Sequence, residues 1–187
     1  MKKGIRQEAI KRRNAIPVRL RREKEENILK LLKTLPLGDH VFIYKNMRSE
    51  VATDKILLWL DESGATAYLP RTELSDHSMQ PHAYKPGDPL EIKNFGMAEP
   101  VNAPLEDLSQ LSAILIPLLA FDRDLHRIGY GGGFYDRFLP RAPQALRIGL
   151  AFSEQEFEPL MQMTTDIPLD YIVTEKEILK RSAGRTF

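Results

Sequence analysis

Residues 113–139 read AILIPLLAFDRDLHRIGYGGGFYDRFL, and this stretch organises the rest of the chain. The apolar run Ala113–Pro117 is typical of a buried strand, and residues 134–139 predict a short helix. A strand, a loop and a helix in this order direct backbone N–H groups and the positive helix terminus at an anion. Glycine suits such a loop because it accepts positive φ and lets a phosphate approach the backbone. The glycines of the loop are Gly129, Gly131, Gly132 and Gly133.

Charged side chains surround these glycines. A nucleotide phosphate with Mg²⁺ would satisfy cations and carboxylates together. The alternative is a flexible turn, which is what glycine clusters usually form. The loop is not a P-loop and lacks the third glycine of the dinucleotide fingerprint, so spacing alone leaves both interpretations open. The charged residues are Arg123, Arg127, Arg137, Asp122, Asp124 and Asp136.

Length and composition favour one domain. The chain has 187 residues, 42% of them hydrophobic, which suits a single core. The net charge of +1 gives no overall field that would select nucleic acid or membrane. No apolar run approaches the length of a membrane helix, and the charged start predicts no secretory signal. The absence of cysteine excludes disulfides and thiolate catalysis, and we expect a cytoplasmic protein.

The N-terminal segment is strongly basic. Residues 1–24 hold ten lysines and arginines against two glutamates. Such asymmetry fits a nucleic-acid arm, two solvated helix faces, or a few cations that face a polyanionic ligand. The apolar spacing predicts one helix that stops before Pro17 and a second that ends at residues 36–38.

Strands and helices alternate along the chain. This order predicts a single three-layer α/β domain over residues 1–187, Rossmann-like, with a largely parallel sheet between helices. Residues 72–88 are expected to form an exposed connection and residues 176–187 a peripheral tail. A helix is expected over residues 54–63. The expected strands are Val41–Tyr44, Ala65–Leu69, Leu90–Phe95, Ala113–Pro117 and Arg147–Phe152.

Glu50 comes shortly after the strand expected at residues 41–44. Open α/β sheets bind ligands beyond the carboxyl ends of their strands, so Glu50 is a candidate ligand contact. The alternative is an exposed loop acid.

Residues 119–136 resemble the signature of the 5-formyltetrahydrofolate cyclo-ligase family, G-[LV]-x-F-D-x-x-G-x-R-[LI]-G-[RY]-G-x-G-[YF]-Y-D-[RK]. Two positions depart from it. Leu125 or His126 replaces the glycine before the arginine, and Tyr130 stands where arginine is common, which removes a phosphate contact. The matching residues are Leu119-Ala120-Phe121-Asp122, Arg127-Ile128-Gly129 and Gly131-Gly132-Gly133-Phe134-Tyr135-Asp136.

Shorter matches extend this resemblance from residue 2 to residue 175. Residues 2–6 (KKGIR) resemble K-x-x-[LI]-R, which reaches the nucleotide in the family. Residues 50–53 (EVAT) resemble E-[VI]-x-T, whose glutamate lies at the folate. Residues 166–175 (DIPLDYIVTE) resemble the family's closing D-x-x-[LV]-D-x-[IV]-[IV]-T-[ED], which implies a second Mg²⁺ ligand.

The resemblance implies an enzyme that uses ATP and Mg²⁺ to convert 5-formyltetrahydrofolate to 5,10-methenyltetrahydrofolate, with release of ADP and phosphate. The formyl oxygen is phosphorylated and thereby becomes a leaving group, and N10 then closes the ring. The implied partners are these small molecules, without membrane or nucleic acid, and we expect a monomer.

The resemblance also assigns residues to roles. The implied catalytic residues are Arg127, Tyr135 and Asp136. The implied ATP-binding residues are Lys2, Lys3, Arg6, Arg127, Gly129, Gly131, Gly132, Gly133, Phe134 and Tyr135. The implied folate-binding residues are Lys45, Met47, Glu50 and Tyr135. The implied Mg²⁺ ligands are Asp136 and Asp170, with Asp166 as second choice for the latter.

Two other functions stay open. A relative that kept the fold but lost the activity would bind folate or nucleotide without catalysis, and Tyr130 and Lys45 leave room for it. A nucleic-acid-binding protein would use the basic N-terminal segment, and its affinity would fall steeply with salt.

Overall fold

A computed structural model describes residues 2–93, 96–160 and 167–181. Its centre is a seven-stranded sheet in the order β11-β10-β9-β6-β1-β2-β3. Strands β10, β9, β6, β1 and β2 run parallel, and antiparallel β3 and β11 form the two edges. The strands are β1 (His40–Ile43), β2 (Thr66–Glu73), β3 (Ser78–Tyr84), β6 (Ala113–Pro117), β9 (Leu146–Leu150), β10 (Tyr171–Val173) and β11 (Ile178–Lys180).

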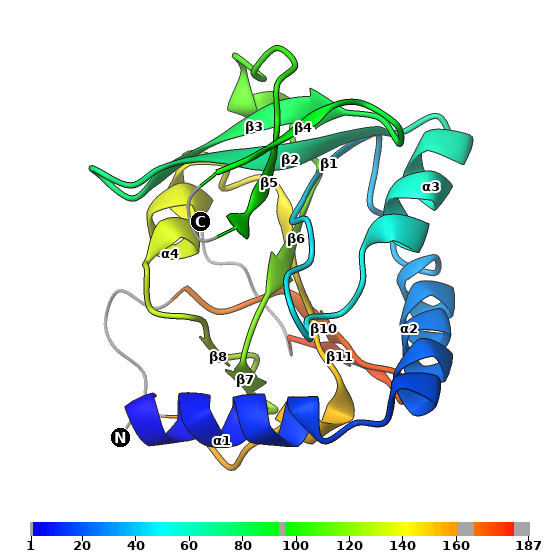
Figure 1. Ribbon diagram of the computed structural model, residues 1–187, viewed down its shortest axis with the longest axis vertical. Helices are drawn as coiled ribbons and strands as arrows, with labels where there is room; N and C mark the ends of the chain where they lie inside the picture. The colour runs from blue at the N-terminus through cyan, green and yellow to red at the C-terminus, as the bar shows by residue number, and fades with distance from the viewer. Residues whose placement is uncertain (1, 94–95, 161–166, 182–187) are drawn as a thin grey trace.

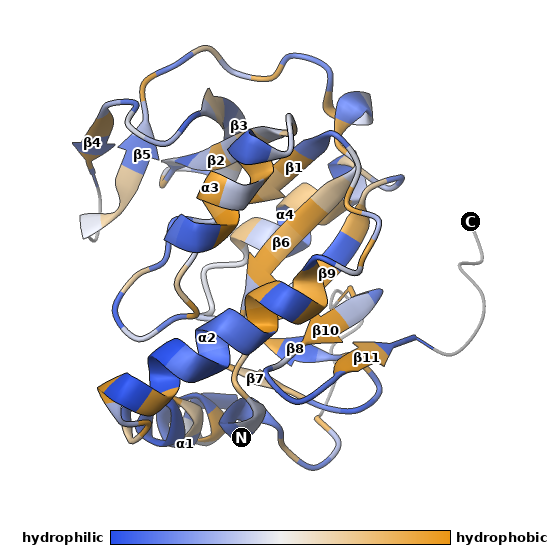
Figure 2. Ribbon diagram, turned by 90° about the vertical axis from the view of Figure 1, so that its right-hand side faces the viewer, coloured by the Kyte–Doolittle hydropathy of each residue, from blue (hydrophilic) through white to orange (hydrophobic). Residues whose placement is uncertain are grey.

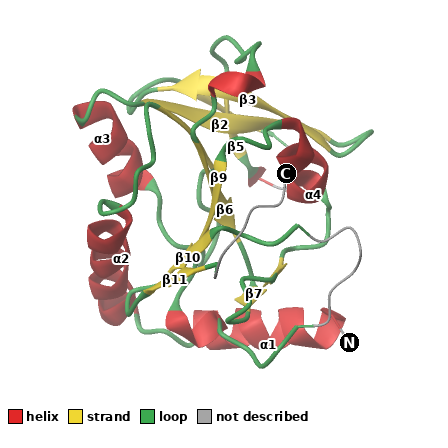
Figure 3. Ribbon diagram, turned by 180° about the vertical axis from the view of Figure 1, so that it is seen from behind, coloured by secondary structure: helices red, strands yellow, loops and turns green. Residues whose placement is uncertain are grey.

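Helices cover both faces of this sheet, so the predicted three-layer α/β architecture is confirmed. Figure 3 shows α2 and α3 on one side of the sheet and α4 on the other. The helices are α1 (Lys2–Asn14), α2 (Val18–Leu32), α3 (Asp54–Glu62) and α4 (Phe134–Phe138).

Strand β6 shows why the sheet needs two covering layers. Its residues are apolar on both faces, as expected for a strand buried on both sides. Leu115 belongs to the core that contains Ile28 of α2 and Ile56 of α3. Ile114 belongs to the opposite core, which contains Phe138 of α4. Figure 2 shows the hydrophobic central strands behind α2 and α3.

Two small sheets lie outside the main one, formed by β4 (Leu90–Ile92) with β5 (Ala98–Pro100) and by β7 (Ala120–Phe121) with β8 (Arg127–Ile128). Helix α1 packs on the β7–β8 pair through a third apolar cluster that includes Ala9, Leu119 and Ile128. Figure 1 shows α1 running beside β7 and β8. The packing brings the basic N-terminal helix to the segment that contains the glycines.

Two predictions about the chain outside the core are wrong. Residues 72–88 are not only a connection, because β2 continues through Pro70 to Glu73 and forms a long hairpin with β3. The tail contributes β11, which pairs with β10. Both segments lie at sheet edges, where one strand face meets water and the sequence needs no continuous apolar run.

Strand β3 has a covered edge. Pro81 lies opposite Pro70 in the hairpin, and its carbonyl accepts a hydrogen bond from the N–H of Leu105 at 2.8 Å. The N–H of Ala83 donates to the carbonyl of Ala103 at 3.2 Å. The segment around residues 103–105 therefore occupies part of the outer side of β3.

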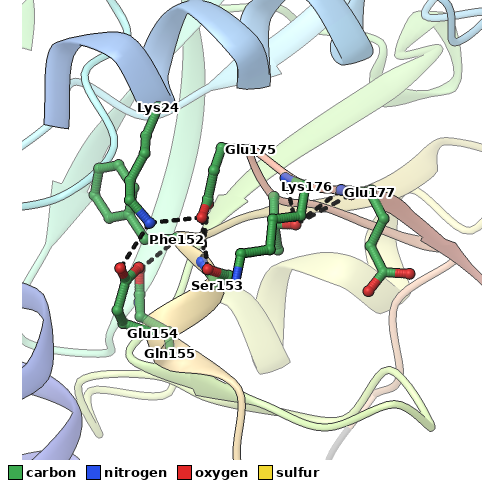
Figure 4. A network of polar contacts seen from close by, with 9 residues as sticks. Lys24, Phe152, Ser153, Glu154, Gln155, Glu175, Lys176 and Glu177 are labelled. Carbon is green, nitrogen blue, oxygen red and sulfur yellow. Dashed lines mark hydrogen bonds and ion pairs between the residues drawn. The ribbon is translucent and has the colours of Figure 1, made fainter. Parts of the chain in front are cut away.

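A buried ion cluster fixes α2 to the segments that follow β9 and β10 (Figure 4). The ammonium of Lys24 lies 2.6 Å from a carboxylate oxygen of Glu154 and 2.6 Å from one of Glu175. Glu154 follows β9 and Glu175 follows β10. The hydroxyl of Ser153 donates to Glu175 at 2.5 Å. The cluster therefore joins a helix to the carboxyl ends of two parallel strands.

Among the residues that the structure describes, no helix is both long enough and apolar enough to span a membrane.

Candidate functional site

The loop after β1 folds back on itself and buries Glu50, whose residue surface is 8% exposed. One carboxylate oxygen accepts the N–H of Met47 at 2.6 Å. Arg48, between them, has φ 52°, a left-handed turn conformation that is uncommon for a residue with a side chain. Glu50 is therefore a buried acid at the carboxyl end of β1, and the interpretation as an exposed loop acid is wrong.

The environment of Glu50 acts on its protonation in two directions. Burial raises the pKa of Glu50 above its ordinary value. Hydrogen bonds from Tyr130 and from the N–H of Met47, and the charges of Arg13 and Arg48, oppose that rise. On balance the pKa of Glu50 is raised, and its carboxylate accepts the Met47 N–H inside the protein.

The glycine loop has the conformation for which glycine is required. Gly131 has φ 103° and Gly133 has φ 72°. Arg6 of α1 reaches this loop, and its Nε donates to the carbonyl of Gly129 at 2.9 Å. A Cβ at Gly131 would lie 3.2 Å from Nη2 of Arg6. The structure therefore brings together the loop and the arginine that were predicted to share a phosphate.

Arg127 and Asp136 form a pair beside the loop. Their Nη2 and Oδ1 atoms lie 2.6 Å apart, and the side chain of Arg127 is only 7% exposed. Nε of Arg127 is buried and has no hydrogen-bond partner among the described residues. A buried donor without a partner is costly, so this nitrogen indicates a place for an acceptor supplied by a ligand.

Tyr135 connects this pair to the Glu50 loop. Its ring centroid lies 6.0 Å from the guanidinium carbon of Arg127. Burial raises the pKa of the Tyr135 phenol far above its usual value, and the nearby charge of Glu50 raises it further. The hydroxyl therefore stays protonated and available as a donor.

The other predicted ligand residues differ in their accessibility. Lys2 is half-buried and Lys3 exposed, both at the start of α1. Lys45 forms an ion pair with Asp54 at the start of α3, so its charge is already shared. Met47 is half-buried. The ring of Phe134 is tilted by 53° against that of His77, with their centroids 5.3 Å apart.

Asp170 has a different setting from Asp136. It precedes β10 and accepts hydrogen bonds from the backbone N–H of Arg147 at 2.8 Å and from its Nε and Nη2 at 3.2 and 3.1 Å. Glu50, in contrast, follows the carboxyl end of a parallel strand. The metal role of Asp170 stays a prediction, and these contacts favour a structural role. Asp166 lies outside the described residues.

Asp122 also has a structural setting. Its carboxylate accepts the N–H groups of Asp124, His126 and Leu160 and contacts Nδ1 of His126. Asp122, Asp124 and His126 have potential ligand atoms within 4.8 Å of one another. Because the carboxylate of Asp122 is engaged by these four groups, we assign it to holding the β7–β8 turn.

The sequence did not single out Arg13 among the basic residues of the N-terminal segment. Arg13 is 2% exposed. Its Nη2 donates to the hydroxyl of Tyr130 at 2.9 Å and its Nε to that of Ser49 at 3.0 Å. The available signal was helical spacing, because Arg6, Ala9 and Arg13 fall on one face of α1.

A cleft of about 420 Å³ opens beyond the carboxyl end of β1, the end from which the Glu50 loop starts. Its residues on β2 extend past the end of β1, since Phe42 pairs with Tyr68 and β2 continues to Glu73. At the tip of the hairpin, whose residues line part of the cleft, the ring of His77 lies 5.3 Å from that of Phe134 at the start of α4. Its cationic lining residues are Arg71, Lys93 and Arg141.

A family profile and curated relatives point to one family. The sequence profile of the 5-formyltetrahydrofolate cyclo-ligase family matches residues 1–175. The 5-formyltetrahydrofolate cyclo-ligase of Haemophilus influenzae is 31% identical over 135 residues, 70% of this chain and 72% of that protein. The enzyme of the same name from Mycolicibacterium smegmatis is 29% identical over 183 residues, 94% of each chain.

A solved structure is similar over the whole chain. The NMR structure of 5,10-methenyltetrahydrofolate synthetase from Aquifex aeolicus superposes with a TM-score of 0.85 at 29% identity. The match covers 100% of this chain and 95% of that one.

Proposed function

Because the chain belongs to the 5-formyltetrahydrofolate cyclo-ligase family, we propose that it converts 5-formyltetrahydrofolate to 5,10-methenyltetrahydrofolate with ATP and Mg²⁺, releasing ADP and phosphate. The observation that carries the nucleotide part is the buried Nε of Arg127, which lies beside Asp136 and the glycine loop and has no hydrogen-bond partner in the described part of the chain. A phosphate oxygen is the acceptor that such a donor needs.

The protein's task in this reaction is to position two ligands and to neutralise charge. The formyl oxygen attacks the γ-phosphorus, ADP leaves, and N10 then displaces phosphate from the formyl carbon. Arg127, Arg6 and the amides of Gly131–Gly133 stabilise the transferring phosphoryl group. Lys2 and Lys3 add positive charge at the start of α1. Gly129 and Phe134 shape the loop, and no side chain acts as a nucleophile.

Asp136 would hold Mg²⁺, which neutralises phosphate oxygens when bound. Asp136 fits this ion, because its side chain is 34% exposed and can be reached from solvent. Mg²⁺ takes one or two carboxylates, with phosphate oxygens and water as its other ligands. Asp170 is the second predicted ligand, although Arg147 engages its carboxylate.

In this proposal the folate binds at the Glu50 loop. Glu50 accepts hydrogen bonds from the pterin, Tyr135 donates toward the formyl group, and Lys45 and Met47 flank the ring. The cleft suits the carboxylates at the glutamate end of folate, because Arg71, Lys93 and Arg141 line it together with one glutamate, Glu73. In this arrangement Tyr135 lies between the two substrates. We further propose that the protein acts as a cytoplasmic monomer.

The activity is tested by mixing the protein with 5-formyltetrahydrofolate and Mg²⁺ and following the near-ultraviolet absorbance of the methenyl product. A rise that requires ATP is expected. A folded protein that binds ATP and folate without any rise would instead be a non-catalytic relative.

Replacing Glu50 with alanine is expected to raise the KM for 5-formyltetrahydrofolate about tenfold and to change the KM for ATP much less. The reason is the loss of a charge-assisted hydrogen bond to one substrate only, at about 1.5 kcal/mol or more. Steady-state kinetics with each substrate varied in turn gives both constants. Glu62→Ala, at an exposed acid at the end of α3, is the control. Equal effects on the two constants would remove Glu50 from the folate site.

Asp136→Asn is expected to lower turnover at least about tenfold and to raise the Mg²⁺ concentration needed for half-maximal rate, because an amide is a weaker ligand than a carboxylate. A Mg²⁺ titration of the initial rate measures both. Asp170→Asn is the matched comparison: a lower melting temperature with an unchanged Mg²⁺ requirement marks a structural acid. Full activity of Asp136→Asn at limiting Mg²⁺ would refute the metal assignment.

A further inference from the structure

One guanidinium joins the two loops of the site. Arg13 lies in the last turn of α1 and contacts Ser49 and Tyr130 through different nitrogens. Ser49 directly precedes Glu50 in the loop after β1. Tyr130 stands between Gly129 and Gly131 in the glycine loop. Arg13 is thus the contact point between the segment assigned to folate and the segment assigned to ATP.

The connection continues from Tyr130 to Glu50. The hydroxyl of Tyr130 accepts Nη2 of Arg13, and burial, helped by the nearby charge of Glu50, raises the pKa of this phenol. Arg13 and Glu50 are buried, at 2% and 8% exposure, whereas Tyr130 between them is 47% exposed. The charge of Arg13 strengthens its hydrogen bond to the phenol. The titratable and charged groups that act on Glu50 or are acted on by it are Arg13, Arg48, Tyr44, Tyr130 and Tyr135.

Arg13 itself is held from the second helix. Arg21 of α2 donates one hydrogen bond of 2.5 Å to the carbonyl of Arg13 and another of 2.5 Å to the carbonyl of Ser49. The hydroxyl of Ser49 donates to the side chain of Asn14 at 2.6 Å. These contacts fix Arg13 to the Glu50 loop. A displacement of the glycine loop would therefore change the hydrogen bond between Arg13 and the Tyr130 hydroxyl.

We propose that Arg13 is a positioning residue that couples the two sites, because it links the position of the glycine loop, through Tyr130, to the placement of the Glu50 carboxylate. The inference rests on the proposed function, since it assigns ATP to one loop and folate to the other. Coupling is reciprocal, so each ligand must change the affinity for the other by the same factor.

The test measures equilibrium binding of a non-hydrolysable ATP analogue with and without saturating 5-formyltetrahydrofolate. In the unmodified protein, folate is expected to tighten analogue binding by roughly fivefold or more. In Arg13→Met this factor falls toward one. Tyr130→Phe gives the same loss, and the double variant is no worse than either single one, because both interrupt one chain of contacts. Arg13→Lys, which keeps the charge, retains part of the factor.

A merely structural role predicts a different pattern. Arg13→Met would then lower the melting temperature and leave the coupling factor unchanged, which would overturn the proposal. Arg19→Met is the matched control, since Arg19 is an exposed cation of α2 paired with Glu23, and the factor should be unaffected.

The outcomes also separate this inference from the proposed function. ATP-dependent formation of the methenyl product together with independent binding of the two ligands keeps the function and refutes the role of Arg13. If the protein binds neither the ATP analogue nor folate, both the proposed function and the role of Arg13 are refuted.

Discussion

Arg127→Met is expected to lower kcat by about 10²–10³-fold, the effect of removing one preorganised donor from a developing oxyanion. The guanidinium is buried and already oriented by Asp136, and its Nε has no hydrogen-bond partner among the described residues. Because it needs no reorganisation when phosphate charge develops, its contribution falls mainly on kcat. Single-turnover absorbance at saturating ATP and folate measures this directly.

Arg137→Met is the matched control for Arg127. Arg137 is exposed, belongs to the same loop and helix, and its Nη1 donates to the carbonyl of Gly132 at 3.2 Å. Its loss is expected to change kcat only slightly, since an exposed cation is well solvated. A circular dichroism spectrum and melting temperature show whether each variant is folded. If folded Arg127→Met and Arg137→Met have the same kcat, Arg127 does not act on the transferring phosphate.

Lys24→Met is expected to reduce the free energy of unfolding at neutral pH by about 3–5 kcal/mol, the usual cost of removing one partner from a buried ion pair. The Lys24 side chain is 9% exposed and lies between two carboxylates. Without the ammonium, Glu154 and Glu175 face each other as like charges. Urea unfolding at constant temperature measures the change.

The pH dependence of this variant has a definite sign. Burial acts to raise the pKa of Glu175, but hydrogen bonds from Lys24 and Ser153 outweigh it and hold the pKa below 4.5. In the unmodified protein, this carboxylate therefore stabilises the fold above about pH 4.5 and less as pH falls through its folded pKa. In Lys24→Met burial acts without the ammonium, so the pKa of Glu175 rises. The stability deficit should then shrink as the pH is lowered from 7 toward 5.

Two variants control the Lys24 experiment. Lys30→Met changes an exposed lysine of the same helix and is expected to alter stability by less than about 0.5 kcal/mol. Lys24→Met/Glu175→Gln removes one of the two carboxylates that have lost their partner, and it should recover part of the lost free energy of unfolding. A deficit that is the same for Lys24→Met and Lys30→Met would show that the buried cluster contributes nothing.

The central parts of the fold and site were predictable for physical reasons. A strand buried on both faces must be apolar throughout, so Ala113–Pro117 was evident from the sequence. Pro17 cannot continue the first helix and lies at the start of the second, and the glycines at 131 and 133 occupy positions with positive φ. The link between Arg6 and the glycine loop, 123 residues apart, came from the family resemblance.

The errors concern features that depend on distant partners. Arg13 is buried only because Tyr130 and Ser49 receive its guanidinium, and a basic segment carries no sign of which cation will be covered. The Mg²⁺ role of Asp170 stays a prediction, and its contact with Arg147 of the neighbouring strand β9 was not foreseen from the sequence. The β2–β3 hairpin was missed because an edge strand with polar residues resembles a connection.

The paired prolines of that hairpin bear on how the molecule behaves at high concentration. An open strand edge is a template for strands of other molecules, and long exposed edges promote aggregation. Pro81 has no N–H to offer an incoming strand, and its carbonyl is already used by Leu105. The N–H of Ala83 is likewise engaged by Ala103. The β3 edge therefore presents no continuous ladder, and sheet extension between copies is blocked on this side.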